Sequence, residues 1–126
     1  MSNQTEFYNI FRDYIMRSIR TTLPCVVISY DKARQVANLQ PSFLMMDDDG
    51  KPVKMGMLQD VPVLVNRFEV DGVEKVYVPI YKPGETVFIS VADRSIDDLQ
   101  NGTFLPQSAR LFNLNDAIVI GGWNLQ

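Results

Sequence analysis

The sequence predicts a mainly β fold, a small closed barrel or sandwich that follows a single N-terminal helix. After Pro24 the apolar residues form short β-branched runs separated by turn signals, among them the Asp-Gly pairs at 49–50 and 71–72. Before Pro24 the apolar residues recur every three or four positions, which is the spacing of a helix. A chain of 126 residues, 46% hydrophobic and 21% charged, is expected to form one globular domain with its own core.

Residues 4–21 are predicted to form the helix. Asn3 and Glu6 have the form of a capping box, in which each side chain satisfies a free backbone amide of the first turn. Pro24 prevents continuation, because the residue before a proline is driven out of the helical region. One apolar stripe follows the helix and contains Phe7, Tyr8, Ile10, Phe11, Tyr14, Ile15 and Ile19.

This stripe is wider than one packing face requires, which is typical of an element shared between subunits. The candidate assembly surface consists of Phe7, Phe11, Tyr14 and Ile15. Four methionines surround the predicted hairpin at residues 43–57, and methionine-rich surfaces are common at adaptable interfaces. The alternative is that the helix and the methionines simply pack on the barrel.

The remaining chain is predicted to form strands and turns. Pro62 is expected at a sheet edge or a bulge, since proline cannot donate to the ladder. Thr86–Val91 is nearly continuously apolar and is therefore expected to be central, while Ser95–Leu99 is short enough for one helical turn. The strands are predicted at 25–30, 35–40, 43–46, 53–57, 61–65, 68–70, 75–80, 86–91 and 116–120.

Composition argues against several classes of function. The chain has no histidine and one cysteine, Cys25, so transition-metal sites built from His and Cys are excluded within one chain, and no cofactor is expected. Cys25 lies in an apolar run and is predicted to be a buried thiol. Acids outnumber bases 15 to 12, which weighs against nucleic acid as a partner. There is no apolar run long enough for a membrane span and no signal peptide pattern.

Two acidic groups resemble sites without meeting the requirements of one. Asp47–Gly50 begins like a calcium loop, but the twelfth position is Leu58 instead of glutamate, so a solvated hairpin tip is expected. Asp93, Asp97 and Asp98 lie near Arg94 without a legible nucleophile or base, so capping and ion pairing are expected. The sequence therefore predicts no enzyme.

Four pieces in a fixed order carry a resemblance to a known family. They are the turn Lys82–Glu85, the apolar strand Thr86–Val91, the Asp-Arg-Ser-hydrophobic-Asp motif at 93–97, and the closing element 114–122. Their order and spacing over residues 24–123 resemble the N-terminal domain of phage membrane-puncturing spike proteins. The chain departs from the usual pattern at Glu85, where the family carries Asp, at Leu99, where it carries Trp, and at Phe112-Asn113, where it carries His-Asp.

The resemblance implies an OB-fold, a small antiparallel Greek-key barrel of five strands, over residues 24–126, preceded by the helix over residues 1–23. It also implies that five residues maintain the structure: Gly84, Asp93, Arg94, Asp97 and Asp116. Asp116 is expected to fix the loop that enters the last strand.

In function, the resemblance implies a structural component of a contractile phage tail or related injection machine. This would be the OB-fold domain of a homotrimeric central baseplate spike, joining tube and hub to the tip that penetrates the host cell membrane. The expected partners are other copies of the chain, baseplate hub and tail tube proteins, and a needle on a separate polypeptide. The needle could also follow in a longer chain, or the protein could be a hub plug without a tip. Synthesis in the host cytoplasm and a place in the virion are expected.

Two other classes of function are weighed against this one. An OB-fold module for single-stranded nucleic acid or another ligand is the first alternative, and it needs a basic groove with aromatic platforms. A cell-wall hydrolase is the second, and neither paired carboxylates nor a histidine supports it.

Overall fold

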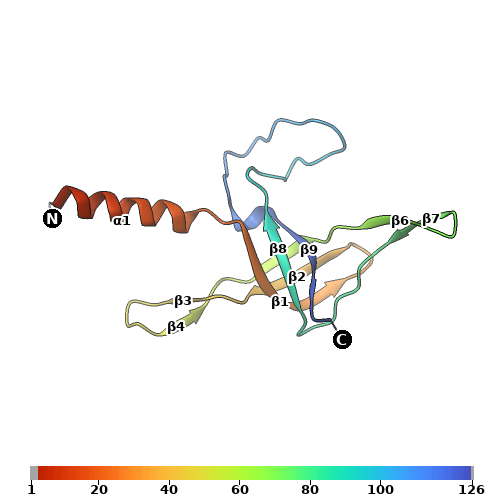
Figure 1. Cartoon of the computed structure of the whole chain (residues 1–126), viewed down its shortest axis with the longest axis horizontal. Helices are drawn as coiled ribbons and strands as arrows, with labels where there is room; N and C mark the ends of the chain where they lie inside the picture. The colour runs from red at the N-terminus through yellow and green to blue at the C-terminus, as the bar shows by residue number, and fades with distance from the viewer. Residues whose placement is uncertain (1–2, 126) are drawn as a thin grey trace. The chain divides into compact units, whose positions relative to one another are not determined.

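The computed structural model describes residues 3–125. Within them the chain forms one α-helix, nine strands and one short 3-10 turn, η1 (Figure 1). Their bounds are α1 (Asn3–Ser18), β1 (Thr22–Asp31), β2 (Val36–Pro41), β3 (Leu44–Met46), β4 (Pro52–Lys54), β5 (Leu58–Pro62), β6 (Asn66–Val70), β7 (Val73–Tyr77), β8 (Thr86–Val91), η1 (Leu114–Asp116) and β9 (Ala117–Trp123).

Five strands form one sheet in the order β5-β2-β1-β8-β9, and β1 pairs antiparallel with both β2 and β8. A parallel bridge joins Val63, which directly follows β5, to Val119 in β9, and the Leu64 amide donates to the Val119 carbonyl at 3.2 Å. The two ends of the sheet order therefore meet, and the sheet curls on itself. This closure of a five-stranded sheet confirms the predicted OB-like fold.

The core follows from strict alternation along the central strands. In β2 and β8 every second side chain is buried, as expected for a sheet with one face turned to the interior. Leu39, Val87 and Ile89 are among the fully buried side chains. Cys25 of β1 is buried as predicted, and burial raises the pKa of its thiol to about 11, so the thiolate is scarce at neutral pH.

Two hairpins, β3–β4 and β6–β7, lie outside the five-stranded sheet, and in Figure 1 each runs outward to its own tip. The predicted Asp-Gly turns close both hairpins. Gly50 has a φ of 78°, and Asp71 and Gly72 have φ angles of 52° and 78°, the positive values that tight hairpin turns require.

All sixteen residues of these four strands are exposed, so neither hairpin contributes a buried side chain to the core. The hairpins are held by their own cross-strand bonds and ring contacts, such as the edge contact between Phe68 and Tyr77 at 5.6 Å between ring centroids. An isolated two-stranded hairpin is only marginally stable in water. Their apolar side chains are therefore available to a partner.

Several predicted boundaries are wrong. The strands predicted at 53–57 and 75–80 are β4, Pro52–Lys54, and β7, Val73–Tyr77, because they pair with β3 and β6 over these ranges. The helix ends at Ser18 instead of residue 21, because the chain is already extended at Thr22, which pairs with Ser90 of β8. The strand predicted at 61–65 is β5, Leu58–Pro62, because it pairs with β2 over this range. Ser95–Leu99 forms a single turn, closed by the Leu99 amide on the Ile96 carbonyl at 3.1 Å, and is not helical.

The chain divides into two compact units. One contains the five-stranded sheet and both hairpins, over Thr22–Ser90 and the segment that begins at Ala117. The other contains α1, the residues up to Thr21 and the segment Val91–Asp116. Within residues 3–125, no helix combines the length and apolar character needed to cross a membrane.

Replacing Ile89 by alanine should lower the free energy of unfolding by about 3 kcal/mol, because it removes a fully buried side chain and leaves a cavity. Chemical denaturation monitored by Trp123 fluorescence measures this change. The matched control is Ile120→Ala in β9, where the side chain is half exposed and the loss should stay below about 1 kcal/mol. Equal losses at the two positions would contradict the assigned core.

Candidate functional site

Asp116 is the buried carboxylate of the unit that contains Val91–Asp116. It ends η1, directly before β9, and its exposed fraction is 0%. Its Oδ1 accepts hydrogen bonds from Arg110 Nη2 at 2.6 Å and from the Ile96 amide at 3.1 Å, and its Oδ2 accepts one from Arg110 Nε at 3.1 Å. Its carbonyl also accepts the Ala92 amide at 2.9 Å. Asp116 therefore joins the beginning of this segment to its end.

Arg110 extends the contact to the Asp-Arg-Ser-hydrophobic-Asp motif. Its Nη2 donates to Ser95 Oγ at 3.0 Å and lies 2.9 Å from Asp97 Oδ1. A buried carboxylate is strongly destabilising unless it is paired and hydrogen-bonded, and Arg110 supplies a two-point contact of the kind that suits guanidinium and carboxylate. The Arg110 side chain thus contacts Ser95, Asp97 and Asp116. Ser95 and Asp116 are 21 positions apart in the chain.

The electrostatics of the pair favour the charged form of both groups. Burial by itself would raise the pKa of the Asp116 carboxyl, but hydrogen bonds from Arg110 and the Ile96 amide outweigh it and hold the pKa below its ordinary value. Hydrogen bonds to Asp116 and Asp97 raise the pKa of Arg110 further above its already high value. Arg110 is therefore a permanent cation and cannot serve as a base.

The structure brings together some of the residues expected to maintain the fold. Asp97 and Asp116 share Arg110, and the backbone of Asp93 and Arg94 pairs with the return limb of the segment. The Phe112 amide donates to the Asp93 carbonyl at 3.2 Å, and Arg94 forms an antiparallel bridge with Leu111. Ser95 caps the following turn, because its Oγ accepts the Asp97 amide at 3.3 Å. The structural role of these residues stays a prediction, now with defined contacts.

Sequence reasoning missed Arg110. The signal that could have found it is the need of a buried acid for a cation: Arg110 and Arg94 are the two basic residues between Val91 and Asp116. Spacing could not choose between them, since the region from 100 to 115 has no period. Only the path of the segment brings Arg110, and not Arg94, to the Asp116 carboxylate.

Gly84 lies apart from this cluster, in the turn that leads into β8. Its φ of 91° strains any residue with a side chain, and its amide donates to the Val27 carbonyl at 2.8 Å. The Glu85 carboxylate accepts the Lys82 amide at 2.6 Å and so closes the turn. Glu85, a departure from the aspartate usual in the resembling family, thus retains a turn-closing contact.

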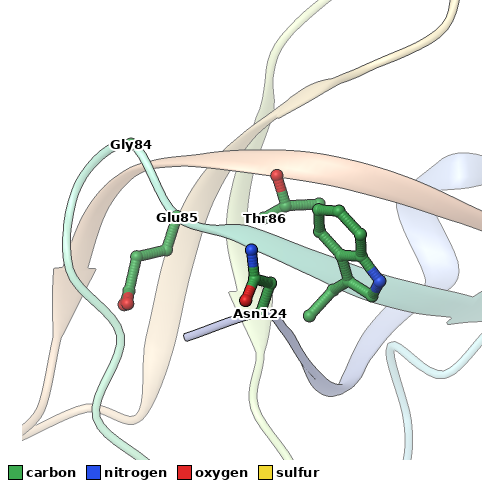
Figure 2. A pocket seen from close by; sticks show the side chains of 5 residues that line it. Gly84, Glu85, Thr86 and Asn124 are labelled. Carbon is green, nitrogen blue, oxygen red and sulfur yellow. The ribbon is translucent and has the colours of Figure 1, made fainter. Parts of the chain in front are cut away.

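A cavity of about 300 Å³ adjoins this turn and is lined by Gly84, Glu85, Thr86, Trp123 and Asn124. In Figure 2 the Glu85 carboxyl group points away from Asn124, in agreement with its hydrogen bond to Lys82. The cavity offers one aromatic side chain and polar groups, but neither a nucleophile with a neighbouring base nor a cation. It therefore does not have the composition of a catalytic site.

The chemistry available at the Arg110 cluster is that of a structural contact. Ser95 has Arg110 as its polar neighbour, and a serine nucleophile needs a base. Among residues 3–125, no group of three or more His, Cys, Asp or Glu side chains is placed to hold a metal ion. The contacts of the cluster are those expected of residues that hold a loop in place.

The candidate assembly surface lies on α1, where no residue is buried. Phe7, Phe11, Tyr14 and Ile15 are all exposed, Tyr14 most of all at 72%. Phe7 and Phe11 stack on each other with ring centroids 6.1 Å apart. Seven large apolar side chains in sixteen helical residues stay in contact with water, and a surface of this kind is typical of interaction sites. Its use in assembly remains a prediction.

Comparison with known families adds independent information. The family described as phage protein Gp138 N-terminal domain matches residues 23–122, which is most of the chain. The match agrees with the range 24–123 over which the sequence motifs resemble phage spike proteins, and it confirms that resemblance. No curated protein matches the chain.

Replacing Arg110 by methionine should lower the midpoint of thermal unfolding by on the order of 10 °C, because it leaves the Asp116 charge buried without its partner. Arg67→Met is the matched control, since Arg67 pairs with Glu74 at 3.1 Å on the surface and both side chains are mostly exposed. Calorimetry measures both variants. A loss no larger than that of the control would show that the Arg110 cluster does not stabilise the fold.

Stability should fall in acid through Asp116. Its folded-state pKa lies below the unfolded value of about 3.9, so its contribution is present above that pH and is lost as the pH falls through the folded pKa. Thermal unfolding between pH 7 and pH 2 should show a decline that Asp116→Asn reduces. The exposed Glu69→Gln should keep the decline of the original chain. An unchanged decline in Asp116→Asn would contradict this assignment.

Proposed function

The chain belongs to the family of the phage protein Gp138 N-terminal domain, and from this premise we propose that it is the OB-fold domain of a homotrimeric central spike. The spike would lie in the baseplate of a contractile phage tail or a related injection machine. The observation that carries the proposal is the coincidence of the family match at 23–122 with the five-stranded barrel. The exposed apolar helix α1 outside the match supports assembly.

The proposed role is structural and not catalytic. The polar cluster that carries this view is the Asp116–Arg110 contact, in which the cation is permanently protonated and the acid is buried and paired. Such a contact suits a domain that must keep its shape under load. The net charge of −3 supports the same view, because it disfavours the phosphate binding that a nucleic-acid module needs.

The proposed partners follow from this position. Copies of the chain would contact one another around the threefold axis, and the assembly would join the tail tube and baseplate hub to the tip that crosses the host membrane. The tip would belong to a separate needle protein or to a further segment of chain. The proposed location is therefore the tail baseplate of the virion.

The mass in solution tests the proposal most directly. Light scattering coupled to size exclusion should give three times the 14.4 kDa of one chain. Replacing Phe11 and Tyr14 by serine should shift the mass toward one chain and leave the thermal midpoint of the barrel nearly unchanged, because both side chains are exposed. The control is Ile80→Ser, an equally apolar and exposed residue outside α1, which should keep the trimer.

A monomer over a wide concentration range would contradict the trimeric spike. Micromolar binding of a single-stranded oligonucleotide with a steep salt dependence would instead favour the alternative, an OB-fold nucleic-acid module. Fluorescence anisotropy at physiological salt measures that affinity, and we expect none.

A further inference from the structure

The hairpin β3–β4 and the residue before it present an exposed apolar surface on the barrel unit. Phe43, Leu44, Met45 and Met46 follow one another in the chain, and each is about half exposed or more. Exposed apolar runs of this kind are typical of interaction sites, and methionine adapts its shape to a partner. The hairpin therefore has the character of a docking surface.

A cavity lies where this hairpin leaves the sheet. It has a volume of about 370 Å³ and is lined by Val26, Ile28, Gln40, Pro41, Ser42, Leu44 and Lys54. The Gln40 side chain in this lining is held in place, because its amide donates to the Met55 carbonyl at 2.7 Å. The lining combines apolar side chains with polar groups and one lysine, Lys54. An aromatic side chain with a polar tip has a matching composition.

The far end of the hairpin is acidic. At the tip, Asp47 is engaged by its own turn, since its Oδ1 accepts the amides of Asp49 at 2.9 Å and Lys51 at 2.7 Å. Asp48 and Asp49 are exposed, and among the described residues neither carboxylate takes part in an ion pair shorter than 4.0 Å. The surface thus leads from a partly apolar cavity, which Lys54 also lines, to the acidic turn at 47–49.

Helix α1 also leads from an apolar residue to charged residues, but its charge is positive. Tyr14 is its most exposed aromatic residue, and Arg17 lies in its last turn, with Arg20 shortly after. Arg17 is three residues, about 4.5 Å along the helix axis, beyond Tyr14. On the hairpin, Asp48 lies in the turn four residues beyond Leu44, which lines the cavity. In both elements the charged residue therefore follows the apolar one toward the end of the element.

We propose that α1 of one copy docks along the β3–β4 hairpin of a second copy, with Tyr14 in the cavity and Arg17 beside Asp48. The proposal rests on the proposed self-assembly and names the two surfaces that meet. The surfaces differ from each other, so the contact is heterologous, and such contacts close a ring when the rotation between copies allows it. Charge complementarity between the basic end of the helix and the three consecutive aspartates at 47–49 favours this hairpin as the docking surface.

Cross-linking between two kinds of chain tests the contact. Chains with Tyr14→Cys and chains with Leu44→Cys, each with its own affinity tag, are co-expressed and treated with a short bis-maleimide. We expect a product that carries both tags. The matched control replaces Leu44→Cys by Val76→Cys on β7, since Val76 is 54% exposed and Leu44 is 57% exposed. The control should give at least fivefold less product, and the original chain should give none because Cys25 is buried.

Charge reversal is a second test of the proposed contact. Arg17→Glu and Asp48→Lys should each reduce the association constant by about tenfold, and their combination should restore most of it. A trimer without the Tyr14–Leu44 product, or with an equal Val76 product, would overturn this contact and leave the proposed function standing. A monomer would overturn both. A third sample is a chain that carries both Tyr14→Cys and Leu44→Cys. A product that forms only within single chains of this sample would show that α1 docks on its own barrel, and would also overturn the contact.

Discussion

The buried pair of Asp116 and Arg110 is the interaction on which the path of the segment Val91–Asp116 depends. This segment has no strand or helix ladder of its own apart from η1, so ordering it costs conformational entropy that few backbone hydrogen bonds offset. Arg110 replaces those missing bonds with contacts to Asp116, Ser95 and Asp97. The same contacts hold the two ends of the segment together, because the Asp116 carbonyl also accepts the Ala92 amide.

The sequence predicts most strands of the barrel, but it does not predict the contacts between residues that are far apart in the chain. Alternation in Val36–Pro41 and continuous apolarity in Thr86–Val91 predict strands whose bounds agree closely with β2 and β8, since a residue's neighbours decide both patterns. The Asp71-Gly72 turn is equally local. The partner of Asp116 was not predictable, because Arg110 reaches it through a segment without a period. The early end of α1 depends on pairing of Thr22 with Ser90, which lies 68 positions away.

The apolar residues of this chain fall into two populations with different purposes. One population, which includes Leu39, Val87 and Ile89, is buried by the curled sheet and accounts for the stability of the barrel. The other population lies on α1 and on the two hairpins, where it is exposed and adds nothing to the core of one chain. Water-exposed apolar surface of this extent is a liability for a chain on its own. A partner that covers it removes the liability.

A threefold assembly places a specific demand on such a chain. Each copy must offer two unlike surfaces, since a single self-complementary patch produces a closed pair and not a ring of three. The exposed helix and the methionine-rich hairpin are unlike in shape, and the basic end of the helix is opposite in charge to the aspartates at the hairpin turn. Within the segment Val91–Asp116, the charged and buried contact between Asp116 and Arg110 is of a kind that holds a loop in one path. The division between a stable barrel and exposed attachments is what a structural component requires.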